Sequence, residues 1–201
     1  MSTHVITVAR QFGSLGRPIA EQLAQRLGFE YIDRDIIEKA AEDLGKPVYE
    51  LMEIDDRNKT PKYMRMMYPL GVGRGEKQDK LFEIERDIII DLAKSKDCVI
   101  VGRCADFILT EAGFRDLYNI FVYASYHDRF NYCLSHLGFN YDAVEKHIKR
   151  VDSERSSYYT HYTGERFDSP KYRDLMINSG SMTFDRIVES LTACAKLRFQ
   201  L

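Results

Sequence analysis

The sequence predicts an α/β fold with a parallel sheet, and two observations carry this prediction. Three short apolar runs, at 5–9, 98–102 and 119–124, have the length and composition of strands that are buried on both faces. Amphipathic segments with helical periodicity lie between them. Because strands that alternate with helices build parallel sheets through right-handed crossovers, we expect an α/β domain of this kind.

Each remaining element has a local signal. Weaker strand patterns lie at 29–33 and 174–178. The helix expected over 16–28 has Pro18 near its start and Gly28 as its stop. Further helices are expected over 34–45, 79–95, 126–138, 141–159 and 183–199. The helix at 141–159 is charged and expected to be exposed, and Thr183 is a plausible N-cap for the last helix.

Length and charge narrow the classes of function. A chain of 201 residues with a formal net charge of −2 is expected to form one domain, without the basic footprint of a nucleic-acid-binding protein. No apolar run approaches the length of a membrane span, and the N-terminus lacks a signal-peptide pattern. We therefore expect a cytoplasmic protein that does not bind membranes, with its four cysteines reduced.

The stretch "ARQFGSLGRPIA" (9–20) follows the first strand and opens a helix. Gly13, Ser14, Leu15 and Gly16 would turn backbone N–H groups and the positive end of the helix dipole toward a phosphate, and Arg17 would clamp it. The phosphate-loop pattern GxxxxGK[ST] matches strictly only at Gly16, since glutamine, arginine and proline stand at positions 11, 17 and 18.

Two other interpretations of this stretch remain open at this point. Asp33 lies 20 residues after Gly13, so the glycines and this carboxylate resemble an incomplete dinucleotide-binding fingerprint. A tight glycine turn without any ligand is the simpler alternative.

Motifs in the rest of the chain favour the first interpretation. The segments "YIDRDII" (31–37), "CVIVGRCADFIL" (98–109), "IFVYASYHDRF" (120–130), "DSERSSYY" (152–159) and "LMINSGSMTFDRIVESL" (175–191) follow the loop in order. Together they resemble the cytidylate kinase-like branch of the P-loop nucleoside monophosphate kinases, along nearly the whole chain except about 46–78.

The resemblance implies a P-loop NTPase-like, three-layer α/β/α fold with a five-stranded parallel sheet. Residues 1–201 would form a single kinase-like domain. Within it, 46–78 would be an inserted, helical segment that binds the acceptor monophosphate, and 138–170 would be a lid.

The resemblance also implies a set of site residues. Donor phosphates of ATP would lie on Gly13, Ser14, Leu15, Gly16 and Arg17. The catalytic residues would be Arg17, Asp152 and Arg155, the last two from the closing lid. The small, nucleotide-like acceptor would be held by Asp33, Arg34, Lys39, Arg103, Asp106 and Arg129.

Three departures from the family pattern bear on activity. Cys104 stands where classical cytidylate kinases have an aspartate, and the lid signature R-D-x-x-D-x-x-R keeps only Asp152 and Arg155. Pro18 removes the usual hydroxyl ligand of the Mg²⁺ that would accompany ATP, although Ser14 offers another hydroxyl. The histidines have no metal-binding spacing, so no protein-bound metal is expected.

Two functions are therefore compared. The first is ATP-dependent phosphoryl transfer to a nucleoside monophosphate or a related small acceptor. The second is a nucleotide-binding, regulatory module that has lost catalysis, which the substitutions at 11, 17 and 18 favour and the retained Arg155 opposes. A dinucleotide oxidoreductase leaves the segments at 102–106 and 152–155 without a role.

Overall fold

A computed structural model describes residues 3–33, 35 and 76–201 of the chain. Five parallel strands form one sheet in the order β2-β3-β1-β4-β5. The strands are β1 (Val5–Arg10), β2 (Glu30–Ile32), β3 (Cys98–Val101), β4 (Leu117–Tyr123) and β5 (Leu175–Asn178). The central strand β1 pairs Val5 with Cys98 on one edge and with Leu117 on the other, and residues 5–9 are buried on both faces of the sheet.

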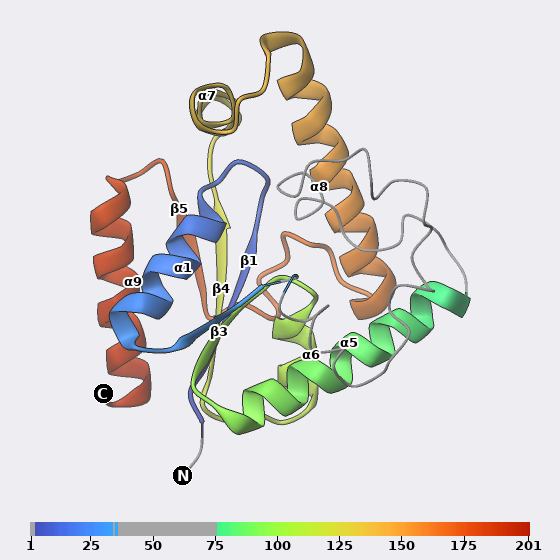
Figure 1. The fold of residues 1–201 in the computed structure, drawn as a ribbon, viewed down its shortest axis with the longest axis vertical. Coiled ribbons are helices and arrows are strands. Elements are labelled where there is room, and N and C mark those ends of the chain that lie inside the picture. The colour runs from blue at the N-terminus through green and yellow to red at the C-terminus, as the bar shows by residue number, and fades with distance from the viewer. Residues whose placement is uncertain (1–2, 34, 36–75) are drawn as a thin grey trace.

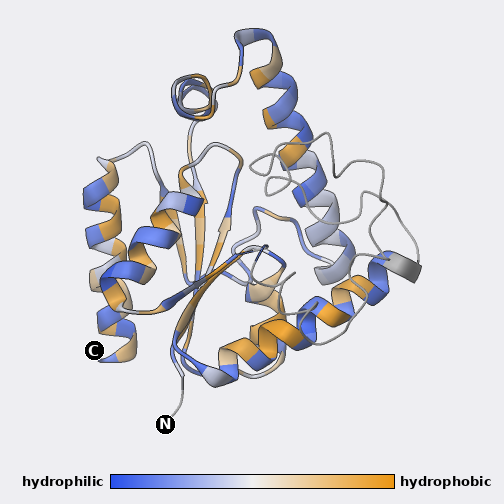
Figure 2. Cartoon of the chain, viewed as in Figure 1, coloured by the Kyte–Doolittle hydropathy of each residue, from blue (hydrophilic) through white to orange (hydrophobic). Residues whose placement is uncertain are grey.

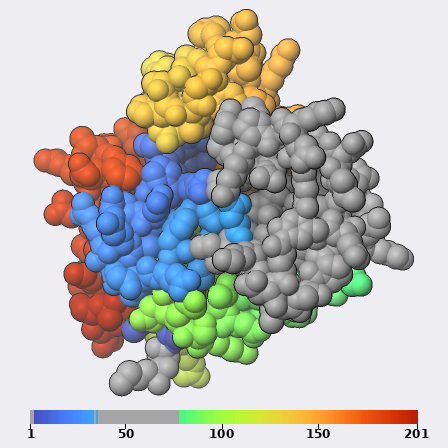
Figure 3. Space-filling model, in the orientation of Figure 1, coloured from blue at the N-terminus to red at the C-terminus, as the bar shows by residue number. Residues whose placement is uncertain are grey.

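Helices cover both faces of the sheet and make three layers (Figure 1). On one face lie α1 (Gly16–Leu27) and α9 (Phe184–Phe199), whose surfaces adjoin in Figure 3. On the other lie α5 (Glu76–Ser95), α6 (Ala105–Glu111) and the C-terminal half of α8 (Tyr141–Thr163). Helix α7 (Tyr126–His136) packs on the other half of α8, beyond the end of β4 (Figure 1).

The apolar side chains that hold these layers alternate along the strands. Ile6 and Val8 pack under α1 and α9, whereas Val5 packs toward α5 and α6. The central strands are accordingly hydrophobic, while helices α5 and α9 alternate hydrophobic and hydrophilic residues along their ribbons (Figure 2). In the described part of the chain, no helix combines the length and apolar character that crossing a membrane requires.

The structure confirms all five expected strands and the helices expected at 16–28, 79–95, 126–138 and 183–199. Helix α8 extends to Thr163 and is not simply exposed, because Val144, Ile148 and Val151 are buried against α7. The short helix α6 was not expected from the sequence. The helix expected over 34–45 and nearly all of the insertion at 46–78 lie outside the described residues, and the lid at 138–170 stays a prediction.

Local signals set the helix ends. Gly28 ends α1 in the left-handed conformation, with φ 70°. Ser125 and Asn140 cap α7 and α8 by accepting backbone N–H groups, as capping side chains do. Thr183 occupies the N-cap position of α9, but its side chain accepts no hydrogen bond from the described residues.

The strand order predicts where a ligand would bind along the carboxyl edge of the sheet. After β1 the chain crosses in α1 over one face, whereas after β3 it crosses in α6 over the other. Neighbouring strands whose connections diverge in this way open a crevice beyond their carboxyl ends, where open α/β sheets bind ligands. In this chain the rule places the expected ligand crevice between the loop after Arg10 and the turn after Val101.

Candidate active site

The loop of residues 11–15 joins β1 to α1 and has the backbone shape of an anion cradle. Gly13 and Leu15 both have positive φ angles, 76° and 62°. Among the described residues, no acceptor meets the backbone N–H groups of Gly13, Leu15 or Gly16. These N–H groups stand at the N-terminus of α1, where the helix dipole adds positive potential. The loop can therefore bind an anion through its backbone.

Gly13 is required where the loop passes over α7. A Cβ atom at this position would lie 3.0 Å from the carbonyl oxygen of Arg129 and 3.0 Å from Sγ of Cys133. A side chain would thus push the loop away from α7 as well as strain its backbone.

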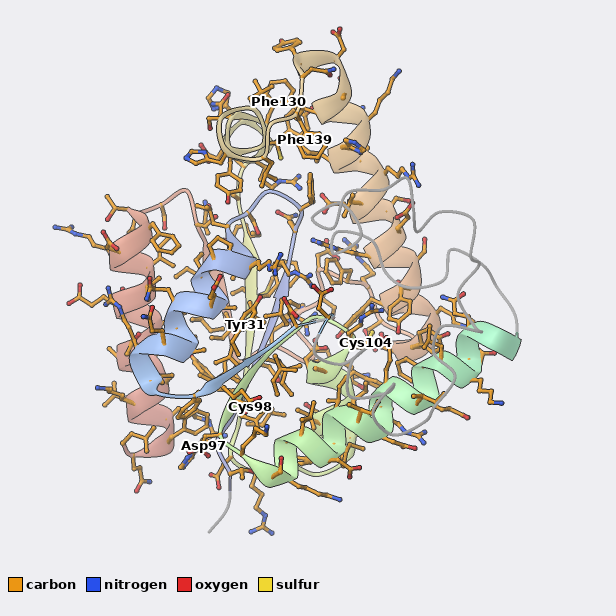
Figure 4. All side chains as sticks on the ribbon, viewed as in Figure 1. Tyr31, Asp97, Cys98, Cys104, Phe130 and Phe139 are labelled. Carbon is orange, nitrogen blue, oxygen red and sulfur yellow. The ribbon has the colours of Figure 1, made fainter. Side chains whose placement is uncertain are left out.

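Two side chains, one from α7 and one from α8, make hydrogen bonds to the backbone of this loop. Asp152 accepts the N–H of Phe12 on Oδ1 at 2.8 Å, and Nη1 of Arg129 donates to the carbonyl of Phe12 at 3.1 Å. The same Nη1 pairs with Oδ2 of Asp152 at 2.5 Å. The ring of Phe12 packs edge-on against Phe139, which lies next to α7 in Figure 4. We call Phe12, Arg129 and Asp152 the loop clamp.

Arg155 lies one helical turn further along α8 and also contacts this loop. Its Nη1 donates to the backbone carbonyl of Arg10 at 3.0 Å, and its guanidinium lies over the ring of Phe12. Burial, together with the charge of Arg10, lowers the pKa of Arg155 well below its ordinary value. The predicted catalytic residues Asp152 and Arg155 therefore both contact the segment that joins β1 to α1.

Arg17 extends from the first turn of α1 toward the end of β2. Its Nη2 pairs with Oδ2 of Asp33 at 2.9 Å, and its Nε donates to the hydroxyl of Tyr31 at 3.3 Å (Tyr31 is labelled in Figure 4). Burial lowers the pKa of Arg17, but the hydrogen bond with Tyr31 and the charge of Asp33 outweigh it, so the pKa rises. Asp33 also accepts the N–H of Asp35, as a capping carboxylate does.

Arg103 follows β3 in a turn of unusual shape. Gly102, Arg103 and Cys104 have φ angles of 79°, 59° and 53°, which is three consecutive residues in the left-handed region. Nη1 of Arg103 lies 3.3 Å from Oε1 of Glu85 on α5, and both side chains are buried. The hydroxyl of Tyr158 donates to the other carboxylate oxygen of Glu85. This pairing orients Arg103 from the α5 side.

Asp106 does not join these residues. It pairs with the fully buried Arg173 and accepts a hydrogen bond from the hydroxyl of Tyr159 at 3.1 Å. The guanidinium of Arg173 lies 5.3 Å from the ring centre of Phe121 and 5.0 Å from that of Tyr159. The contacts of Asp106 thus tie α6 to α8 and to the segment before β5. Arg34 and Lys39 lie outside the described residues.

Arg10 is a residue of this site that was not expected. Its side chain runs from the end of β1 past Gly16 to Gly102. Burial lowers its pKa to about 10, with further contributions from the charges of Arg103 and Arg17. The signal in the sequence was available, because Arg10 directly follows the apolar run at 5–9 and is the last residue of β1, whereas Arg103 comes two residues after β3.

The loop offers no hydroxyl for a metal ion. Ser14 is almost fully buried, and its Oγ donates toward the carbonyl oxygens of Gln11 and Val122, at 2.9 and 3.0 Å. Position 18 is a proline. The described loop residues therefore do not fit the usual hydroxyl ligand of Mg²⁺, and Ser14 does not take over that role.

The model of the cytidylate kinase-like family matches residues 5–181. No curated protein matches.

Three solved structures illustrate the similarity in fold. An uncharacterized protein from Eubacterium ventriosum aligns with TM-score 0.74 and 17% identity, over 96% of this chain and 99% of its own. Shikimate kinase from Bacteroides thetaiotaomicron aligns with TM-score 0.54 and 17% identity, over 98% and 99%. A gluconokinase from Sinorhizobium meliloti aligns with TM-score 0.56 and 12% identity, over 98% and 94%.

The fold is thus that of P-loop kinases, and the family match extends from β1 through β5 and includes every described residue of the loop, the loop clamp and the turn after β3. On this match, the chain belongs to the cytidylate kinase-like family.

Proposed function

We propose that this protein transfers the γ-phosphoryl group of ATP to a small acceptor, and that the acceptor is a nucleoside monophosphate similar to cytidylate. One observation carries the proposal. Arg10, Arg17 and Arg103 come together where the loop after β1 meets the turn after β3, and the charges of Arg17 and Arg103 act on Arg10. Phosphoryl transfer needs such positive charge around the phosphate oxygens, and little else from the protein.

The proposal assigns the two substrates to two sides of the crevice. Donor phosphates would lie on the backbone N–H groups of residues 13–16, and the acceptor would lie toward Arg103 and Asp33. Arg155 would act from behind the loop, since its hydrogen bond to the carbonyl of Arg10 supports the strand end that presents the cations. Mg²⁺ would arrive with ATP, and we assign it no protein ligand.

The test is an assay of ADP release with ATP, Mg²⁺ and a panel of acceptors. The panel contains the nucleoside monophosphates, and also shikimate and gluconate, after which two of the structural neighbours are named. We expect release only with a nucleoside monophosphate, highest with CMP, and we expect Arg155→Ala to abolish most of it. Release with none of the nucleotides would contradict the proposal.

A second candidate is a nucleotide-binding module without catalysis. The hydroxyl of Ser14 is already hydrogen-bonded to backbone carbonyls, so the loop offers no hydroxyl ligand for Mg²⁺, which favours this candidate. Calorimetry separates the two functions: tight binding of ATP without release of ADP for any acceptor favours the module. Replacing Arg17 and Pro18 by lysine and threonine would restore the pattern, and activity in that variant alone would establish the module.

A further inference from the structure

Two glycines make room for the side chain of Arg10. A Cβ atom on Gly16 would collide with Cβ and Cγ of Arg10, and one on Gly102 would collide with its Nη1. Gly102 also has a φ of 79°, which other residues rarely adopt. The two glycines come from opposite sides of the crevice, one from the start of α1 and one from the end of β3. The fold therefore keeps the side chain of Arg10 between the start of α1 and the turn after β3.

The guanidinium of Arg10 lacks a hydrogen-bond acceptor among the described residues. Its backbone carbonyl is held by Arg155, but no described side chain or carbonyl accepts from its Nε or Nη atoms. Asp33 and Tyr31 act on it only through their charge or dipole. Arg10 is half-buried, and a partly buried guanidinium without a protein acceptor favours an anion as its partner. The pKa of about 10 keeps it charged at neutral pH.

Arg17 differs from Arg10 in this respect, although it stands where the phosphate-loop pattern has its lysine. Its Nη2 pairs with Asp33, and its Nε donates to Tyr31. An arginine held by a carboxylate at 2.9 Å would have to give up a charge-assisted hydrogen bond before turning to a phosphate. The sequence position and the structure thus point to different arginines.

We infer that Arg10 is the residue whose side chain binds the phosphate oxyanion in the crevice, while Arg17 is a positioning residue that fixes the ends of α1 and β2 through Asp33 and Tyr31. The inference rests on the proposed function for the identity of the phosphate compound. The oxyanion is a phosphate group of the donor nucleotide or of the acceptor, since Arg10 lies between the donor loop and Arg103.

The test compares Arg10→Gln and Arg17→Gln with a matched control, Arg26→Gln, which removes the same charge from the exposed far end of α1. Calorimetry measures the Kd of β,γ-methylene-ATP, of CMP and of inorganic tripolyphosphate for each protein. We expect R10Q to raise the Kd of at least one of them by about 10- to 100-fold, as the loss of a charge-assisted hydrogen bond does. R17Q should raise the Kd values less than R10Q does, because the side chain of Arg17 is held by Asp33 and Tyr31, and R26Q should leave them nearly unchanged.

The separate ligands identify which phosphate is bound. A loss confined to β,γ-methylene-ATP places Arg10 on the donor, and a loss confined to CMP places it on the acceptor. Arg10→Lys keeps the charge but not the planar fork, so it should bind more weakly than wild type and more tightly than R10Q. Thermal unfolding shows whether each variant is folded. If R10Q is not folded, the Kd of R10K compared with that of wild type tests the inference.

Three results would overturn the inference: Kd values of R10Q equal to those of wild type, a larger loss in R17Q than in R10Q, or wild-type affinity in R10K. Failure of the proposed function has another signature. If wild type binds neither nucleotide, that function is wrong, and tripolyphosphate decides the role of Arg10. Binding of tripolyphosphate by wild type but not by R10Q would support the inference, and its absence in wild type would refute both.

Discussion

The carboxylate of Asp152 accepts the backbone N–H of Phe12 at 2.8 Å, although the two residues are 140 positions apart in the chain. The contact joins α8 to the loop of residues 11–15. It means that a residue predicted to be catalytic helps to shape the loop, together with Arg129. A movement of this part of α8 would therefore also move the backbone N–H groups of the loop.

Replacing Asp152 by asparagine keeps an oxygen for the N–H of Phe12 but removes the charge that faces the buried Arg129. We expect the free energy of unfolding to fall by about 2 kcal/mol, because a buried cation loses its counterion. The Kd of β,γ-methylene-ATP should rise, whereas the KM of the acceptor should change little. Asp142→Asn, at an exposed position of the same helix, serves as the control. An effect on the acceptor KM alone would contradict a role in shaping the loop and would indicate that Asp152 acts on the acceptor.

Glu85 is a second test, on the acceptor side of the crevice. Glu85→Gln removes the charge opposite Arg103 and weakens the hydrogen bond from Tyr158, so we expect a loss of about 1–3 kcal/mol in the free energy of unfolding. If Glu85 orients Arg103, the acceptor KM should rise while the Kd of β,γ-methylene-ATP stays constant. Glu83→Gln, on the exposed side of α5, should change neither. If the role of Glu85 is purely structural, Glu85→Gln should lower the free energy of unfolding and leave the acceptor KM unchanged.

The glycines allow backbone strain to be separated from steric contact. Gly13→Ala and Gly28→Ala both place a Cβ on a left-handed residue, at φ 76° and 70°. Only Gly13 has neighbours there, since nothing lies within 4 Å of a Cβ on Gly28. We expect about 1 kcal/mol of destabilisation for Gly28→Ala, and more for Gly13→Ala. Denaturant unfolding measures both losses in the free energy of unfolding. Equal losses would show that α7 can shift to accommodate the added Cβ atom at little cost.

Much of the fold could be predicted because burial leaves a clear pattern. Strands covered on both faces, such as β1 and β3, must be apolar along their length, and the longer helices show a complete apolar stripe. Helix α6 has only seven residues, Ala105–Glu111, so its periodicity is too short to stand out. The buried side of α8 was missed because its charged residues outnumber Val144, Ile148 and Val151.

The candidate site was predicted less completely, for a physical reason. Arg103 could be expected because a charged residue after a buried strand lies at the carboxyl edge of the sheet. Arg10 satisfies the same condition, but the phosphate-loop pattern begins one residue later, at Gln11. The loop clamp and the pair of Asp106 with Arg173 depend on how distant helices pack, and spacing along one chain does not reveal such contacts.

The cysteines give a prediction about reactivity. Burial raises the pKa of Cys98 to about 12 and that of Cys133 to about 11, and it raises the pKa of Cys104 as well. Since the thiolate is the reactive form, these three thiols should resist a disulfide reagent at pH 8 in the folded protein. Cys194 is exposed and should react. We expect one fast thiol in native protein, none in Cys194→Ser, and all four thiols of wild type after unfolding. A second fast thiol in the native state would contradict the buried environment.

The same thiols make stability depend on alkaline pH. Their ordinary pKa is about 9, so between about pH 9 and 10 the unfolded chain releases protons that the folded protein retains. Because the folded state then binds more protons, the free energy of unfolding falls as pH rises through this window. Arg10 and Arg173, whose pKa values are lowered to about 10, act in the opposite direction only from about pH 10 upward. Denaturant midpoints at pH 7.5, 9 and 10 measure the slope. Cys133→Ala should flatten it and the exposed Cys194→Ala should not, whereas an equal slope in all three proteins would assign the effect to other groups.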